Sequence, residues 1–289
     1  MRRKTLYLSD LDGTLLMPDA SLSPFSRQCL NELIRQGLSF SCATARTAAS
    51  AVPILDGLFL PLPVILLNGS CLFDLRTKRY EAVHYLHADA FAALLSLCQE
   101  SGIHGFFHTI ENDTLCTYYT KTDTPIAAAY MQDRIKRYHK RFIPLSDPAE
   151  IPNTHAVVYF TYTNTAQKLD PLLPRIQALP HLRYEYYEDV YHPGFQYLEI
   201  FDASASKYSA SRYLAQSRGF TRIVAFGDNK NDLPLFAAAD YKIAVENAVP
   251  ALQACADELC FANTQNGVCR WLLAHAVCAP PAKTGTKEV

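Results

Sequence analysis

Two stretches far apart in the sequence share one pattern, an apolar run that ends abruptly in acidic residues. One stretch occupies residues 5–14 and the other residues 222–232. In a chain that alternates strands with helices, two such strands can lie side by side in a parallel sheet. Ligands bind beyond the carboxyl ends of the strands in open sheets of this kind. We therefore expect the acidic residues at the two strand ends to converge on one site. These residues are Asp10, Asp12, Asp228 and Asp232.

The close approach of these carboxylates has a chemical consequence. Carboxylates at close range raise one another's pKa, so three or four of them do not sit together as bare charges. A hard cation that prefers oxygen ligands relieves this repulsion. Mg²⁺ is such a cation, and it typically binds one or two carboxylates, several waters and a substrate phosphate. The two strand ends therefore predict a metal site that handles phosphate.

Four motifs carry a family resemblance. They are Asp10-Leu11-Asp12-Gly13-Thr14, residues 41–46, Lys207 and residues 227–232. In this order they resemble the motifs of the haloacid dehalogenase superfamily, and within it the Cof-type sugar-phosphate phosphatases, whose cap is of type IIB. Softer matches are Asn68-Gly69, Asn247-Ala248 and Asn266-Gly267. The resemblance covers roughly residues 5–82 and 194–270.

The resemblance implies a doubly wound, parallel, Rossmann-like α/β core with an inserted α/β cap domain. We expect the core in residues 1–83 and 193–289, and the cap in residues 84–192, where aromatic strands dominate. The resemblance also implies that the cap selects the substrate. A helix is predicted for residues 165–179, and a disordered tail for residues 279–289. Apolar runs predict further core strands at residues 38–43, 63–67, 197–201 and 243–245.

The resemblance also assigns the chemistry. Asp10 is expected to attack phosphorus and become an aspartyl phosphate, and Asp12 to protonate the leaving oxygen and then activate water. Thr44, Lys207 and backbone amides around Leu11 are expected to hold the phosphoryl oxygens. The expected ligands of Mg²⁺ are the Asp10 carboxylate, the Asp12 carbonyl and Asp228, with Asp232 at or beside the metal. The residues expected to bind phosphate or substrate are Leu11, Thr44, Ala45, Arg46, Asn68, Gly69, Lys207 and Asn231.

Two positions depart from the family pattern. Ala45 stands where the family usually has glycine, and its methyl group restricts the backbone beside Thr44. Tyr208 stands where a small residue commonly follows the motif lysine. Neither change removes a catalytic group, so both bear on substrate fit more than on chemistry.

Composition limits the possible partners. The 289 residues carry 27 basic and 28 acidic side chains, so no overall field attracts nucleic acid or a membrane surface. No apolar run reaches the roughly 18 residues of a membrane span. The nine cysteines include no Cys-x-x-Cys pair, which favours reduced thiols in a cytoplasmic protein. We expect a small phosphorylated metabolite as partner, no nucleic acid, no membrane, and a monomer or weak homodimer.

Two alternative functions stay open. A phosphomutase of the type IIB branch, like phosphomannomutase, shares these motifs but returns the phosphate to a bound sugar. A non-catalytic ligand sensor on the same fold is disfavoured, because both Asp10 and Asp12 are present.

Overall fold

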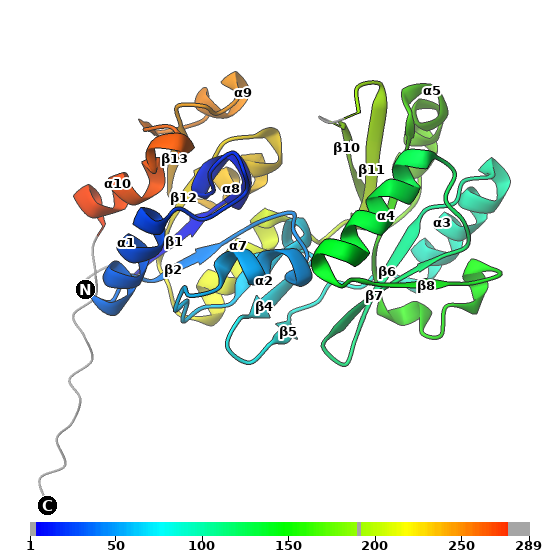
Figure 1. Ribbon diagram of the computed structural model, residues 1–289, viewed down its shortest axis with the longest axis horizontal. Helices are drawn as coiled ribbons and strands as arrows, with labels where there is room; N and C mark the ends of the chain where they lie inside the picture. The colour runs from blue at the N-terminus through cyan, green and yellow to red at the C-terminus, as the bar shows by residue number, and fades with distance from the viewer. Residues whose placement is uncertain (1–3, 190–191, 277–289) are drawn as a thin grey trace, which may run out of the picture. The chain divides into compact units, whose positions relative to one another are not determined.

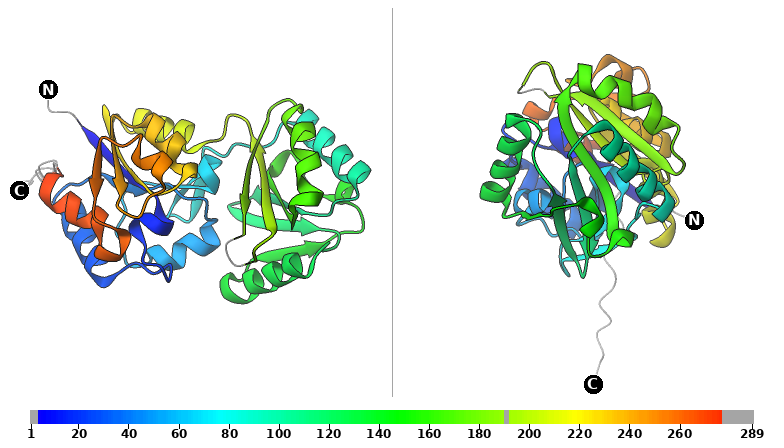
Figure 2. Two further views of the ribbon diagram at one scale, coloured as in Figure 1. Left: turned by 90° about the horizontal axis from the view of Figure 1, so that it is seen from above. Right: turned by 90° about the vertical axis from the view of Figure 1, so that its right-hand side faces the viewer.

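The computed structural model describes residues 4–189 and 192–276, so the tail predicted for residues 279–289 lies outside the described part. The chain forms two compact units, which can be followed in Figures 1 and 2. One unit, here called the core, joins the chain up to Glu81 with the chain from Ser206, and the other, the cap, is Ala82–Ala205. Among the described residues, no helix is both long and apolar enough to cross a membrane.

A five-stranded parallel sheet forms the centre of the core, in the order β14-β13-β12-β1-β2. From β1 the chain moves outward in one direction, and from β12 it moves outward in the other, which makes the sheet doubly wound. The structure therefore confirms the predicted fold class. The strands are β1 (Thr5–Ser9), β2 (Phe40–Cys42), β12 (Arg222–Gly227), β13 (Tyr241–Val245) and β14 (Glu258–Cys260).

Helices cover both faces of this sheet (Figure 1). Helix α1 packs beside α10 and α7 packs beside α8, and right-handed crossovers place these two pairs on opposite faces. Helix α1 begins at Pro24, after the cap residue Ser23, whose hydroxyl accepts the Ser26 N–H at 3.0 Å. The core helices are α1 (Pro24–Arg35), α2 (Ala48–Leu55), α7 (Lys207–Ser217), α8 (Leu233–Ala238), α9 (Pro250–Gln253) and α10 (Gly267–His275).

A small antiparallel sheet extends the core beyond β2. The predicted strand at residues 63–67 is β3 (Val64–Leu66), which pairs with β4 (Cys71–Asp74), and β4 pairs with β5 (Arg79–Glu81). A single parallel bridge between Ala43 and Ile65 connects β3 to the chain just after β2. The loops that follow β2 and β3 are thereby held next to each other.

The cap is built on a six-stranded sheet in the order β10-β11-β9-β6-β7-β8. One face packs on α3, α5 and α6 through a large apolar cluster, and α4 packs on the other face around Phe106 and Met131. The cap strands are β6 (Phe106–Glu111), β7 (Thr114–Tyr119), β8 (Arg141–Pro144), β9 (Val157–Thr165), β10 (Leu182–Glu188) and β11 (Phe195–Asp202). The cap helices are α3 (Ala88–Ser101), α4 (Pro125–Tyr138), α5 (Ala166–Leu169) and α6 (Leu173–Gln177).

The predicted core strand at residues 197–201 is wrong. It is part of β11, which pairs with β9 and β10 in the cap. Leu198 and Ile200 are buried in the cap's apolar cluster, while Glu199 between them faces the other side. This alternation is typical of an antiparallel sheet with two unlike faces, whereas strands of a parallel core are apolar on both. The second boundary therefore lies after Ala205, rather than after residue 192 as predicted.

The predicted helix at residues 165–179 is also wrong in part. The segment divides into α5, a short turn (Asp170–Leu172) and α6. Pro171 and Pro174 lack the N–H that a continuous helix needs at these positions, so the helix is interrupted there.

Candidate active site

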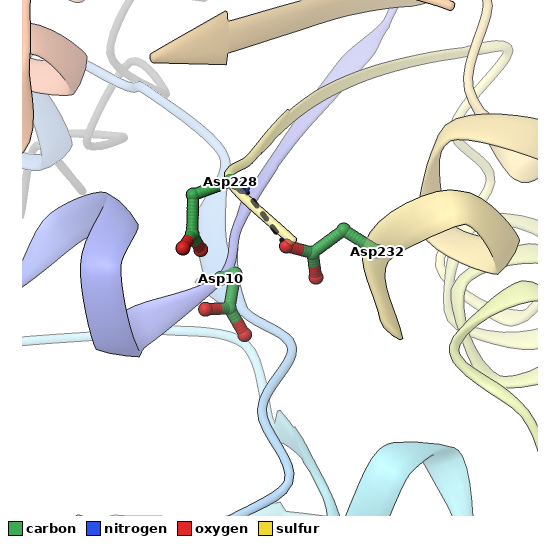
Figure 3. Close-up of side chains that lie close together, drawn as sticks. All are labelled: Asp10, Asp228 and Asp232. Carbon is green, nitrogen blue, oxygen red and sulfur yellow. Dashed lines mark hydrogen bonds between the residues drawn. The ribbon is translucent and has the colours of Figure 1, made fainter. Parts of the chain in front are cut away.

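Asp10 and Asp228 lie side by side because the strands before them are neighbours. Ser9, the last residue of β1, is in register with Phe226 of β12, and the Asp10 N–H donates to the Phe226 carbonyl at 3.0 Å. Asp232 follows four residues after Asp228, in the turn Lys230–Asp232. Figure 3 shows the three side chains together, and one carboxylate oxygen from each lies within 4.8 Å of the others. The two strand ends therefore converge as the sequence predicts.

The loop after β1 is fitted closely against Asp228. Gly13 has a φ of +77°, and a β-carbon there would lie 2.3 Å from Asp228 Oδ2, so only glycine fits. The Thr14 hydroxyl donates to Asp228 Oδ1 at 2.8 Å. These contacts fix the orientation of the Asp228 carboxylate.

Lys207 connects two of the three carboxylates. It is the first residue of α7, it is fully buried, and its Nζ lies 2.6 Å from Asp10 Oδ1 and 2.6 Å from Asp232 Oδ1. The second oxygen of Asp232 accepts the N–H groups of Asp228 at 3.0 Å and Asn229 at 3.2 Å. Asp232 is therefore occupied on both oxygens, and it positions Lys207 and the backbone at Asp228.

The electrostatics of this cluster favour a cation. Burial and the charge of Asp232 raise the pKa of Asp10 well above its ordinary value, and the same two causes raise the pKa of Asp228 to about 6. Burial acts to lower the pKa of Lys207, but Asp10 and Asp232 outweigh it and raise this pKa. One lysine thus faces three carboxylates, and an excess of negative charge is left. A hard, oxygen-binding cation fits this donor set, with Asp10 and Asp228 as the carboxylates that would hold it.

The Asp12 carboxylate lies apart from this cluster. Its side chain is half exposed, and both of its oxygens accept from Arg46, at 2.7 Å from Nε and 2.5 Å from Nη2. Three of the four predicted carboxylates converge, and the fourth turns toward the loop after β2. This position is compatible with the expected metal ligand at Asp12, which is its carbonyl and not its carboxylate.

The loops after β2 and β3 bring the other predicted residues close together. The Thr44 carbonyl accepts the Asn68 N–H at 3.1 Å, and the Thr44 hydroxyl accepts the Arg46 N–H at 3.2 Å. A β-carbon at Gly69, whose φ is +96°, would lie 2.0 Å from the Ser206 carbonyl oxygen, so this loop also packs on the start of α7. Of the remaining candidates, Leu11 is buried, Ala45 is exposed, and Asn231 is half-buried in the turn before α8.

Sequence reasoning gave no role to three polar residues that hold these loops. Thr14 bonds to Asp228, Asn247 donates to the Gly13 carbonyl at 2.8 Å, and Asn263 donates to the Leu16 carbonyl at 2.8 Å. Asn247 and Asn263 lie more than two hundred residues along the chain from their partners, so no local pattern indicates the contacts. The softer motif match at Asn247-Ala248 was the signal that could have drawn attention to this loop.

Comparison with known proteins gives the family. The model for haloacid dehalogenase-like hydrolases matches residues 7–272 of the chain. The chain belongs to this family. It is a phosphatase with the Cof-type architecture, as the sequence motifs predict. Members of the family generally use a divalent metal, with which the buried carboxylate cluster is compatible.

Individual relatives are similar along nearly their whole length. The pyridoxal phosphate phosphatase YbhA of Escherichia coli is 27% identical over 278 residues, which are 93% of this chain and 97% of YbhA. The crystal structure of TM0651 from Thermotoga maritima has a TM-score of 0.75 at 22% identity and covers 96% of this chain and 98% of that one. The subclass IIB sugar phosphatase BT4131 has a TM-score of 0.69 at 18% identity, with 94% and 98% covered. At these identities the two structures support the fold.

Proposed function

We propose that the phosphatase is Mg²⁺-dependent and hydrolyses small phosphomonoesters, foremost sugar phosphates, through an aspartyl phosphate on Asp10. The observation that carries this proposal is the cluster of Asp10, Asp228 and Asp232 around Lys207, with carboxylate oxygens within 4.8 Å of one another. Asp10 and Asp228 would hold the Mg²⁺ ion, which would supply positive charge to the phosphoryl oxygens.

In the first step, a carboxylate oxygen of Asp10 attacks phosphorus and the bond from phosphorus to the substrate oxygen breaks. Lys207 donates to Asp10 Oδ1 at 2.6 Å and so orients the attacking carboxylate. Asp12 gives a proton to the departing alkoxide. In the second step water attacks phosphorus, Asp12 takes a proton from the water, and the bond from phosphorus to the Asp10 oxygen breaks, which releases inorganic phosphate and regenerates Asp10.

Arg46 orients the side chain of Asp12. Its guanidinium is largely buried and donates to both oxygens of Asp12. The carboxyl group is thereby held in one orientation for its exchange of protons with the leaving oxygen and with water.

The choice of substrate is assigned to the cap. Its sheet carries a face with Arg183, Glu185 and Glu199 on neighbouring strands, groups suited to polar substrates with several hydroxyls. YbhA is named for pyridoxal phosphate and BT4131 for sugar phosphates, so small phosphoesters of both kinds belong in a substrate screen.

Release of inorganic phosphate from a panel of sugar phosphates and pyridoxal phosphate tests the proposal. We expect turnover with Mg²⁺, loss of turnover with EDTA, and recovery when Mg²⁺ is restored. Asp228→Ala should require far more Mg²⁺, whereas Asp240→Ala, which removes a carboxylate bonded to the Ile223 N–H at 2.8 Å in the same unit, should not. Full activity after metal removal would refute the metal requirement. Conversion of a sugar phosphate to its isomer without phosphate release would assign a phosphomutase instead.

A further inference from the structure

A short segment after β13 contacts both halves of the carboxylate site. The Asn247 side chain donates to the Gly13 carbonyl at 2.8 Å, and two residues later the Val249 N–H donates to the Asp228 carbonyl at 2.8 Å. Gly13 lies so close to the Asp228 side chain that a β-carbon at Gly13 would not fit. Residues 247–249 thus link the loop that carries Asp10 and Asp12 to the loop that carries Asp228.

A second asparagine supports the first. The Asn263 N–H donates to Asn247 Oδ1 at 2.9 Å, and the buried Asn263 side chain donates to the Leu16 carbonyl at 2.8 Å. Asn247 is therefore bound at both ends of its amide, and the loop after β1 is held at two carbonyls, those of Gly13 and Leu16. Asn247 itself is exposed, so its hydrogen bonds do not serve to satisfy a buried side chain.

From these contacts we propose that Asn247 is a positioning residue for the metal site: it sets the distance between the Asp10 loop and Asp228, and thereby the affinity for Mg²⁺. The inference rests on the proposed metal dependence. A displacement of the loop at Gly13 would also disturb the neighbouring Thr14 hydrogen bond to Asp228. Mg²⁺ demands near-ideal geometry from its ligands, so it is sensitive to such a displacement.

The chain offers a matched control. Asn31 on α1 makes the same two kinds of contact as Asn247, donating to the Gly57 carbonyl at 2.8 Å and accepting the Phe59 N–H at 3.0 Å. Neither partner belongs to the carboxylate site. Replacing Asn31 by alanine therefore removes an equal number of hydrogen bonds from a loop in the same unit.

Isothermal titration of the full-length proteins with Mg²⁺ alone, without substrate, tests the proposal. We expect Asn247→Ala to raise the dissociation constant for Mg²⁺ about tenfold, the equivalent of one hydrogen bond, and Asn31→Ala to leave it within about twofold of wild type. Saturating Mg²⁺ should also raise the melting temperature less in Asn247→Ala than in Asn31→Ala.

Asn247→Ser, whose side chain is too short to reach the Gly13 carbonyl, serves the same purpose if the alanine variant does not fold. Equal Mg²⁺ affinity in wild type and in the folded Asn247 variant would overturn the positioning role alone. A wild-type protein that binds no Mg²⁺ would overturn the proposed metal site, and the inference with it.

Discussion

The core and the cap each hold carboxylates at close range, and they relieve the repulsion in different ways. In the cap, Glu185 and Glu199 lie directly opposite each other on β10 and β11. Arg183 pairs with Glu185 at 2.7 Å, while burial and the charge of Glu185 raise the pKa of Glu199 to about 7. One carboxylate is thus balanced by an arginine, and the other is able to retain a proton near neutral pH.

In the core, Lys207 neutralises part of the charge of Asp10 and Asp232, and Asp228 is left with the Thr14 hydroxyl as its side-chain donor. The core carboxylates follow the ends of parallel strands, where loops and backbone N–H groups shape the space around them. The cap carboxylates stand in mid-strand on the face of a sheet. We therefore propose that the position in the fold decides how the excess charge is removed, by a proton on Glu199 in the cap and by the proposed metal ion in the core.

Loss of the proposed nucleophile, Asp10, is expected to have the largest effect on the core. Asp10→Asn removes the proposed nucleophile at the end of β1, so hydrolysis should fall for every phosphoester, by roughly 10⁶-fold, as is typical when a catalytic nucleophile is removed. Steady-state phosphate release with a sugar phosphate and with p-nitrophenyl phosphate measures this. Retention of more than a small percentage of activity with either ester would assign the nucleophile elsewhere.

The next largest effect separates Asp12 from the clustered carboxylates. A sugar alkoxide is a poor leaving group that needs a proton, whereas nitrophenolate leaves without one. Asp12→Asn should slow the first phosphoryl transfer from a sugar phosphate by about 10²–10⁴-fold, and far less from p-nitrophenyl phosphate. Single-turnover kinetics are required, because Asp12 is also proposed to activate water in the later hydrolysis. Equal slowing with both esters would rule out the role as general acid.

Removal of the basic side chain that balances the carboxylates in each unit compares the core with the cap directly. Lys207→Met leaves Asp10 and Asp232 buried without their partner, which should lower the free energy of unfolding by about 3–5 kcal/mol. Mg²⁺ should restore part of this stability. Arg183→Met in the cap breaks a more accessible pair, so it should cost about 1 kcal/mol or less from the lost ion pair. Urea unfolding with and without Mg²⁺ gives both values, and a larger loss for Arg183→Met would reverse the comparison.

The smallest expected effect concerns Glu199. Its pKa is about 7 in the folded cap and near the ordinary 4.5 in the unfolded chain, so between these values the folded state binds the extra proton. Stability should therefore fall as the pH rises from about 4.5 to 7, by roughly 1–2 kcal/mol once partial solvent exposure is considered. Glu199→Gln cannot ionise and should flatten this dependence. Thermal melts of both proteins across this range measure it, and identical pH profiles would exclude Glu199 as the cause.

The sequence was sufficient for the carboxylate cluster, because each strand and the acids after it are contiguous in the chain. The strand at residues 197–201 was misplaced because its pairing partners, β9 and β10, are not encoded in its own apolar pattern. The turn of Asp12 toward Arg46 could not be predicted, since it depends on how the loop after β2 is held at Thr44 and Leu67. The contacts of Asn247 and Asn263 depend on the assembled fold in the same way.

Trapping of the phosphorylated enzyme tests the central claim most directly. Wild-type protein mixed with a good substrate and Mg²⁺, and quenched in acid within one turnover, should carry one phosphoryl group on the peptide that contains Asp10. Asp10→Asn should carry none, and addition of EDTA before the substrate should prevent the modification. Rapid phosphate release by a wild-type enzyme whose Asp10 peptide stays unmodified, or a phosphoryl group on another residue, would contradict the account.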